Sequence, residues 1–237
     1  MRVLVFLLAM LLAPVAARAE TIMVNSSDGG LYLVDVETLA AEKVAQTPAF
    51  FDIAIDAKGV IYGVTASGQI WQVEPGGTHL PLAFLRHFVN ALVFQPGGGM
   101  IGAGYDKVVA IAPDSGAVHL LGGFPGFRSS GDMEFGPGGV LYATGSPGPN
   151  ETDTLFRMAP GGAMEAIGPI GFRNVYGLAW SRQHDTLFGV TEARELIVID
   201  LATGAGRSLG VLPISGRGYG ASGFGAGPAV IGALSVR

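Results

Sequence analysis

The sequence predicts an all-β fold, a five-bladed β-propeller built from four-stranded antiparallel blades. Three observations support it. A strand–turn–strand pattern recurs at intervals of roughly forty residues, glycine-rich turns separate the strands, and Gly or Pro interrupts nearly every ten-residue window after residue 20. A repeat of this length made of short strands is typical of a propeller, in which each repeat forms one blade.

The register of the repeat can be followed at equivalent positions of each unit. The third strand carries an aliphatic residue at intervals of 39, 39, 46 and 41 residues, at Leu31, Ile70, Val109, Leu155 and Leu196. The longest interval contains an insertion, SPGPNETD, at residues 146–153. The first strand has matching positions at Ile53, Leu92, Met133 and Leu178. The units account for residues 20–237 as one propeller domain.

The strands and turns of each unit have the composition that a blade requires. Segments 108–112 and 196–200 are almost wholly apolar, which suits sheets packed on both faces by neighbouring blades. Pro-Gly-Gly turns begin at Pro75, Pro96, Pro137 and Pro160. Proline fixes φ at the first turn position and glycine accepts the positive φ that follows. Turn chemistry therefore explains most of the 38 glycines without a ligand.

One unit is divided between the two ends of the chain, so we expect the terminal strands to close the ring. Residues 21–25 align with a second strand, 28–36 with a third and 40–47 with a fourth, while Gly218 to Gly225 align with the missing first strand. Residues 229–236, AVIGALSV, also have the pattern of a second strand. The sequence leaves open which of the two second-strand segments completes the closing blade.

The N-terminal segment has the features of a secretory signal peptide over residues 1–19. Arg2 provides the positive charge, residues 3–12 are apolar, and Ala-Arg-Ala at 17–19 forms a cleavage site. The apolar run is too short for a mature transmembrane helix, and no later segment is long and apolar enough to span a membrane. We therefore expect a periplasmic or secreted protein with no membrane span after cleavage.

The charge and cysteine content exclude several classes of function. The chain has a net charge of −5, and loss of Arg2 and Arg18 with the signal peptide would leave −7. An acidic chain lacks the basic face that nucleic-acid binding needs, so we expect no nucleic-acid partner. The absence of cysteine excludes disulfides and thiolate metal sites.

A recurring arginine marks the connections between the fourth strand of one blade and the first strand of the next. Four connections carry it, at Arg86, Arg128, Arg173 and Arg217, and the first strands that follow include Asn90 and Tyr176. These positions predict a ligand site at the channel mouth, where guanidinium groups could hold an anion. In the alternative interpretation the arginines are structural and pair with acidic residues of nearby loops, at Asp28, Asp106, Asp153 and Glu192.

Oxygen-bearing side chains also stand at or near the starts of the first strands. Asp52, Asn90, Asp132 and Glu134 could converge on the channel and hold a hard cation such as Ca²⁺. The alternative is that they only line a water-filled channel. Aromatic residues flank the same loops, at Phe50, Phe51, Phe88, Phe127, Phe172 and Tyr219. They could form a platform for a sugar or a protein, or fill gaps between blades.

The repeat resembles secreted bacterial propellers of the YVTN/NHL and regucalcin–gluconolactonase-like group. The resemblance is carried by F-x-P-G-G-x-L-Y-A-T at residues 135–144 and D-x-x-T-G at 200–204, and it extends along the whole mature chain. Hydrolytic members of that group have six blades and bind a divalent cation in the channel through Glu, Asn and Asp. Here five blades are expected, and Asp52, Asn90 and Asp132 match those ligands only in residue type.

Three functions are compatible with the sequence. The first is a non-catalytic propeller that binds a protein, a glycan or a small anionic ligand at the channel mouth. The second, implied by the resemblance, is a metal-dependent, lactonase-like hydrolase that uses the axial carboxylates. The third is a lectin with one sugar site per blade. Because propellers host many activities, the fold does not choose among them.

Overall fold

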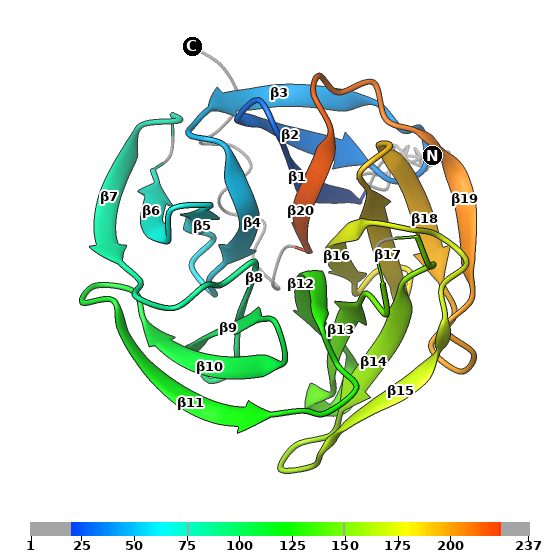
Figure 1. Ribbon diagram of the computed structural model, residues 1–237. Coiled ribbons are helices and arrows are strands. Elements are labelled where there is room, and N and C mark those ends of the chain that lie inside the picture. The colour runs from blue at the N-terminus through cyan, green and yellow to red at the C-terminus, as the bar shows by residue number, and fades with distance from the viewer. Residues whose placement is uncertain (1–19, 75, 149, 224–237) are drawn as a thin grey trace, which may run out of the picture.

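The protein is a five-bladed β-propeller whose blades are arranged around a central axis (Figure 1). The computed structural model describes residues 20–74, 76–148 and 150–223, so the predicted signal peptide lies outside the described residues. Each blade is an antiparallel sheet of four strands, and the five-bladed prediction is confirmed. No helix in the described part of the chain is long and apolar enough to cross a membrane.

The strands of each blade run in order from the channel outwards. Blade 1 contains β20 (Gly218–Gly223), β1 (Thr21–Ser26), β2 (Gly30–Asp35) and β3 (Ala41–Gln46). Blade 2 contains β4 (Phe50–Ile55), β5 (Ile61–Thr65), β6 (Gln69–Val73) and β7 (His79–Phe84). Blade 3 contains β8 (Ala91–Phe94), β9 (Met100–Gly104), β10 (Lys107–Ala112) and β11 (Ala117–Gly123). Blade 4 contains β12 (Ser129–Phe135), β13 (Leu141–Gly145), β14 (Thr154–Met158) and β15 (Met164–Pro169). Blade 5 contains β16 (Val175–Ser181), β17 (Thr186–Thr191), β18 (Glu195–Ile199) and β19 (Gly206–Val211).

The hydrophobic core lies between the blades. Five clusters of buried side chains fill the five blade–blade interfaces; Met23 and Leu31 of blade 1, for example, share a cluster with Phe50 and Ile61 of blade 2. Each middle strand therefore packs on both faces, as its continuous apolar sequence predicts. The one helical element among the described residues is a 3₁₀ turn, η1 (Pro137–Gly139), where Gly138 has a φ of 65°. That turn is one of the Pro-Gly-Gly sequences predicted to connect strands.

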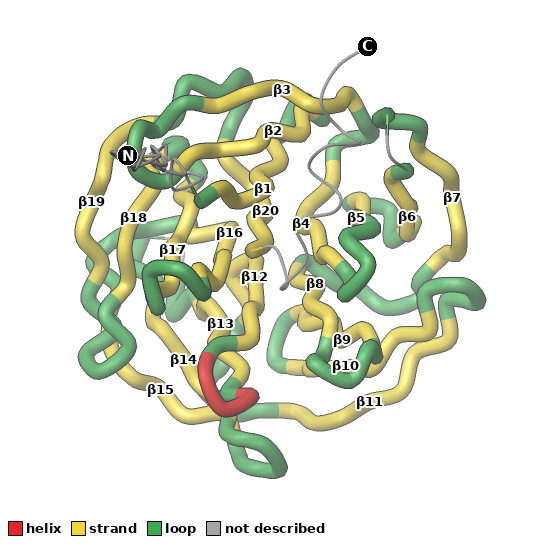
Figure 2. The backbone as a smooth tube through the Cα atoms, turned by 180° about the vertical axis from the view of Figure 1, so that it is seen from behind, coloured by secondary structure: helices red, strands yellow, loops and turns green. Residues whose placement is uncertain are grey.

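A β-bulge recurs in the outer half of every blade. The pairing of the third strand with the fourth shifts register beside Leu31, Ile70, Val109, Leu155 and Leu196. These are the positions that fix the repeat in the sequence. Because a bulge bends its strand and increases the local twist, the outermost strands curve around the rim (Figure 2).

The two ends of the chain close the ring within blade 1. β1 lies between β20 and β2, with Val24 opposite Ala221 on one side and Tyr32 on the other. Residues 21–26 are thus the second strand of the closing blade, whereas the competing segment 229–236 lies outside the described residues. β20 is the innermost strand, as predicted from Gly218 to Gly225, although its described extent ends at Gly223.

Candidate functional site

A second set of bulges shapes one end of the channel. In β4 and β16 the pairing skips one residue, Phe51 and Tyr176, respectively. In β20 two residues, including Tyr219, stand opposite one residue of β1, and in β12 the residues 130–132 stand opposite one of β13. A bulge redirects the side chain that it inserts. The starts of four of the five inner strands therefore present extra residues at the channel mouth.

These residues enclose a pocket of about 280 Å³ at the mouth. Its lining comprises Phe51, Phe88, Asn90, Ser130, Gly131, Tyr176, Glu192, Arg217 and Tyr219. The aromatic rings form a continuous chain: Phe88 and Phe51 have centroids 6.1 Å apart, Phe51 and Tyr219 6.3 Å, and Tyr219 and Tyr176 6.0 Å. Each pair meets edge to face, the arrangement that the ring quadrupole favours.

The pocket includes three of the six predicted ligand-binding residues. Asn90, Tyr176 and Arg217 line it, whereas Arg86, Arg128 and Arg173 do not. Arg128 lies over the ring of Tyr105, with its guanidinium carbon 6.0 Å from the ring centroid. Arg86 and Arg173 are exposed and form no ion pair with another described residue. The repeated arginines therefore do not form a ring around the pocket.

The alternative pairing of these arginines with loop carboxylates occurs in one blade interface. Arg217 Nη1 donates to Glu192 Oε1 at 2.8 Å, and Asn174 Nδ2 donates to the other oxygen, Oε2, at 2.7 Å. The other loop carboxylates have different partners. Asp28 accepts from Ser215, Asp106 pairs with Lys107, and Asp153 accepts from Ser130 Oγ and from the N–H of Val175.

The axial aspartates have a role that their sequence positions did not reveal. Asp52 of blade 2 accepts the N–H of Leu92 in blade 3 at 2.6 Å. Asp132 of blade 4 accepts the N–H of Leu178 in blade 5 and of Ala221 in blade 1. The two carboxyl groups are neighbours at the centre of the ring and influence each other's pKa. Two buried side chains thus connect the inner strands of all five blades.

Burial dominates the electrostatics of these groups. Burial raises the pKa of Asp52 and of Asp132, and for Asp132 the nearby Asp52 carboxylate raises the pKa further. Burial also raises the pKa of Glu134 to about 7, although that carboxylate accepts the N–H groups of Phe135 and Gly223. Glu134 lies in a depression of about 340 Å³ at the opposite end of the channel, together with Arg182.

The predicted Ca²⁺ ligands do not fit a calcium ion. Calcium takes six to eight oxygen ligands, but Asp52, Asp132 and Glu134 direct their oxygens at main-chain N–H groups. Asn90 Oδ1 is buried and has no hydrogen-bond partner, while Nδ2 of the same side chain donates to the carbonyl of Ser130 at 3.2 Å. Among the described residues, no three His, Asp or Glu side chains are grouped to hold a metal.

The sequence singled out some aromatic residues of the pocket but not its small or acidic members. Phe51, Phe88 and Tyr219 line the pocket, while Phe50 and Phe127 are buried between blades and Phe172 packs against the cluster between blades 4 and 5. Ser130, Gly131 and Glu192 were not predicted as ligand contacts. Ser130 and Gly131 reach the pocket because residues 130–132 stand opposite one residue of β13, and strand length gives no signal of this, since β12 and β16 are both seven residues long.

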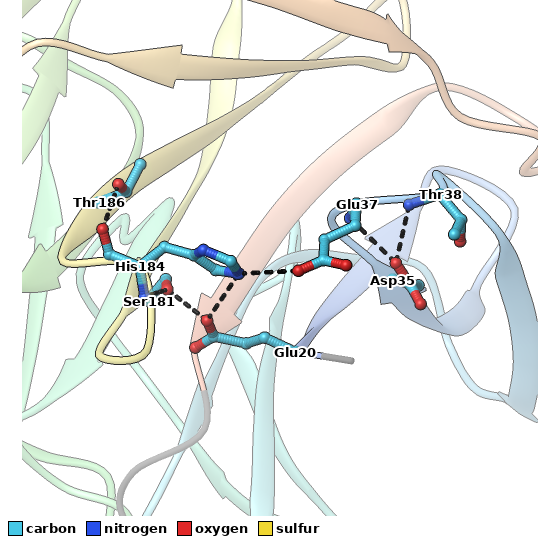
Figure 3. A network of polar contacts seen from close by, with 7 residues as sticks. All are labelled: Glu20, Asp35, Glu37, Thr38, Ser181, His184 and Thr186. Atoms are coloured by element: carbon cyan, nitrogen blue, oxygen red, sulfur yellow. Dashed lines mark hydrogen bonds and ion pairs between the residues drawn. The ribbon is translucent and has the colours of Figure 1, made fainter. Parts of the chain in front are cut away.

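A separate polar cluster joins blades 5 and 1 in the turn after β16 (Figure 3). His184 Nε2 lies 3.6 Å from a carboxylate oxygen of Glu20 and 3.6 Å from one of Glu37. Ser181 Oγ donates to Glu20 and accepts the N–H of His184. These contacts connect a turn of blade 5 to the residue that precedes β1, so they support ring closure.

The comparisons with known proteins show the fold and no family. No protein-family model matches the sequence, and no curated protein matches it. A gluconolactonase from Xanthomonas campestris is similar in structure, with a TM-score of 0.54, 16% identity, and coverage of 86% of this chain and 75% of that one. A protein of unknown function from Bacteroides thetaiotaomicron has a TM-score of 0.58 and 11% identity, covering 86% of this chain and 62% of that one.

A symmetrical protein of de novo evolutionary emergence is also similar, with a TM-score of 0.54, 18% identity, and coverage of 85% of this chain and 93% of that one. At these identities the similarity shows the fold alone. The chain is thus a β-propeller with distant structural similarity to gluconolactonase-like and NHL-like propellers.

Proposed function

We propose that this protein is a non-catalytic binding propeller of the periplasm or the secreted space, and that its ligand binds in the aromatic pocket at the channel mouth. The observation that carries the proposal is the pocket itself. Residues of all five blades and loops converge there, and it combines aromatic walls with the polar groups of Asn90, Arg217 and Glu192. A concave, mostly apolar site with a few polar groups is the usual form of a small-molecule site.

The contacts of the ionisable groups favour binding over catalysis. Asp52 and Asp132 are fully buried and bonded to main-chain N–H groups, so neither is placed to act on a ligand in the pocket. The hydrolase alternative depends on a metal held by these residues, and their geometry gives it no support. The lectin with one site per blade requires equivalent loop residues in every blade, and the pocket instead takes different residues from each.

Protein-observed NMR with a set of small probes tests the proposal. The set contains neutral methyl glycosides, glucuronate, inorganic phosphate and tetramethylammonium. We expect at least one probe to shift the resonances of Tyr176, Tyr219 and Asn90, and Tyr176→Ala to remove that response. Phe84→Ala is the matched control, because Phe84 is an aromatic residue that is 58% exposed on the outer strand β7. If no probe perturbs the mouth residues, or if Tyr176→Ala changes nothing, the proposed function is wrong.

A further inference from the structure

We infer that the pocket takes an uncharged, hydroxyl-bearing ring, the terminal sugar unit of a glycan, and not an anion. This inference rests on the proposed function, since it names the ligand class of the same pocket. Three properties of the pocket support it: the pairing of its charged groups, the nature of its walls, and its unused hydrogen-bonding groups.

The first property is charge. Arg217 is the one cationic side chain that lines the pocket within the described part of the chain, and it is already bonded to Glu192 at 2.8 Å. Glu192 in turn has both oxygens occupied, by Arg217 and Asn174. The ion pair with Glu192 offsets the positive charge of Arg217, so the pocket presents no unpaired cation to an anion. A cation would be repelled by the positive charge of Arg217, which lines the pocket.

The acidic groups around the pocket also disfavour an anionic ligand. Asp153 accepts a hydrogen bond from Ser130 of the pocket wall. Burial raises the pKa of the Tyr176 hydroxyl, and the negative charges of Glu192 and Asp153 raise it further. Glu192 and Asp153 lie close to the pocket, and the one cationic group, Arg217, is offset by its ion pair with Glu192, so a negative ligand is disfavoured.

The second property is the wall. Four aromatic rings, from Phe51, Phe88, Tyr176 and Tyr219, come from four separate segments of the chain. Neighbouring rings are inclined by 68°, 70° and 71°, so the pocket offers both ring faces and ring edges. The C–H groups on one side of a sugar ring pack well on an aromatic face, whereas a fully hydrated ion does not.

The third property is the set of unused polar groups. The hydroxyls of Tyr176 and Tyr219 have no hydrogen-bond partner among the described residues, and the guanidinium of Arg217 has donors beyond the one bound to Glu192. A tyrosine hydroxyl both donates and accepts, and sugar hydroxyls do the same. The volume, about 280 Å³, lies just below the usual range for ligand pockets, which suits one ring better than a chain of several.

Saturation-transfer NMR with the intact protein tests the ligand class. The probes are the methyl glycosides of glucose, galactose, mannose and xylose, set against glucuronate, inorganic phosphate and tetramethylammonium. We expect a neutral glycoside to bind with an affinity that does not change with salt, because no charge pair forms. Tyr176→Ala should weaken that binding by about tenfold or more, Tyr176→Phe should weaken it less, and Phe84→Ala should leave it unchanged.

The outcomes separate this inference from the proposed function. If phosphate, glucuronate or tetramethylammonium binds through Tyr176 while every neutral glycoside fails, the pocket is a binding site and the inferred ligand class is wrong. If nothing binds at the mouth, both are wrong. Melting curves of Tyr176→Ala and Tyr176→Phe establish that each variant is folded. If Tyr176→Ala is unfolded, Tyr176→Phe and Tyr219→Phe decide the question, because both keep the ring and lose the hydroxyl that the inference uses.

Discussion

Single residues near the channel axis decide how tightly the inner strands approach one another. Gly220 is the clearest case, because it lies against the carboxylate that joins blades 2 and 3. A Cβ at position 220 would lie 2.0 Å from Asp52 Oδ1, 2.7 Å from Asp52 Cα and 2.8 Å from Asn25 Oδ1. Backbone and buried polar atoms cannot move aside freely at such distances. The glycine is therefore required by space and not by turn conformation.

We expect Gly220→Ala to destabilise the protein by about 3 kcal/mol, a typical cost of overfilling a packed core. Urea unfolding measures the change. The matched control is Gly97→Ala, since a Cβ at Gly97 would have no atom within 4 Å; its effect should stay within about 0.5 kcal/mol. Equal stability of the two variants would contradict the close packing of β20 against Asp52.

Glu134 is expected to make stability depend on pH. Its pKa is raised from 4.5 to about 7 in the folded protein, mainly by burial. The folded state therefore binds this proton more tightly than the unfolded state does, and the stability that Glu134 contributes is fully present below pH 4.5 and is lost as the pH rises through about 7.

The melting temperature should fall over that pH range. The melting temperature of Glu134→Gln should fall less steeply, because the glutamine side chain does not titrate. Glu165→Gln is the matched control, because Glu165 lies on the outer strand β15 with a side chain that is 64% exposed. If Glu134→Gln and the wild type have parallel pH profiles, the buried carboxylate does not titrate as expected.

At the scale of elements, the bulges and the closing strand matter more than the regular pairing. The bulges in β4, β12, β16 and β20 create the pocket, while β8 has regular pairing and contributes Asn90 from just before its first residue. β20 also completes the ring, because Ala221 belongs to the hydrophobic cluster between blades 1 and 5 and its N–H bonds to Asp132.

Deleting residues 218–237 should abolish the cooperative unfolding transition. Without β20, blade 1 loses its inner strand and the apolar faces of β1 and β16 are exposed to solvent. Chemical denaturation followed by circular dichroism tests this, with a chain ending at Gly223 for comparison. A chain lacking 218–237 that unfolds as steeply as the one ending at Gly223 would show that the ring does not need its closing strand.

At the scale of the whole molecule, stability comes from five similar interfaces closed into a ring, with Asp52 and Asp132 joining them at the centre. The sequence predicts a calcium ion at the same central position. The protein's own N–H groups fill the role of the cation there, because they offer positive hydrogen atoms to the buried carboxylates.

Calcium should therefore leave the melting temperature unchanged relative to a sample treated with EDTA. A ligand that binds only the folded state raises its stability in proportion to the logarithm of ligand concentration. Calorimetry across a calcium series, together with elemental analysis of the purified protein, measures this. A melting temperature that rises and keeps rising with calcium would restore the metal site and the hydrolase hypothesis with it.

The sequence by itself determined the blade count, the four-stranded repeat, the Pro-Gly-Gly turns and the division of one blade between the chain ends. These features depend on neighbours in sequence, since periodicity and turn chemistry are local. It also identified Asn90, Tyr176 and Arg217 near one end of the channel, because the repeat places equivalent strands at equivalent points.

Only the tertiary structure decided which of the repeated residues act together. In the folded protein Arg217 lines the pocket, whereas Arg86, Arg128 and Arg173 do not. Asp132 accepts the N–H of Ala221, which lies 89 residues further along the chain. The repeat makes such residues equivalent in sequence, but bulges in individual inner strands make them different in space. The direction of a buried carboxylate depends on which N–H groups of other blades lie within reach, and that is fixed only when the ring closes.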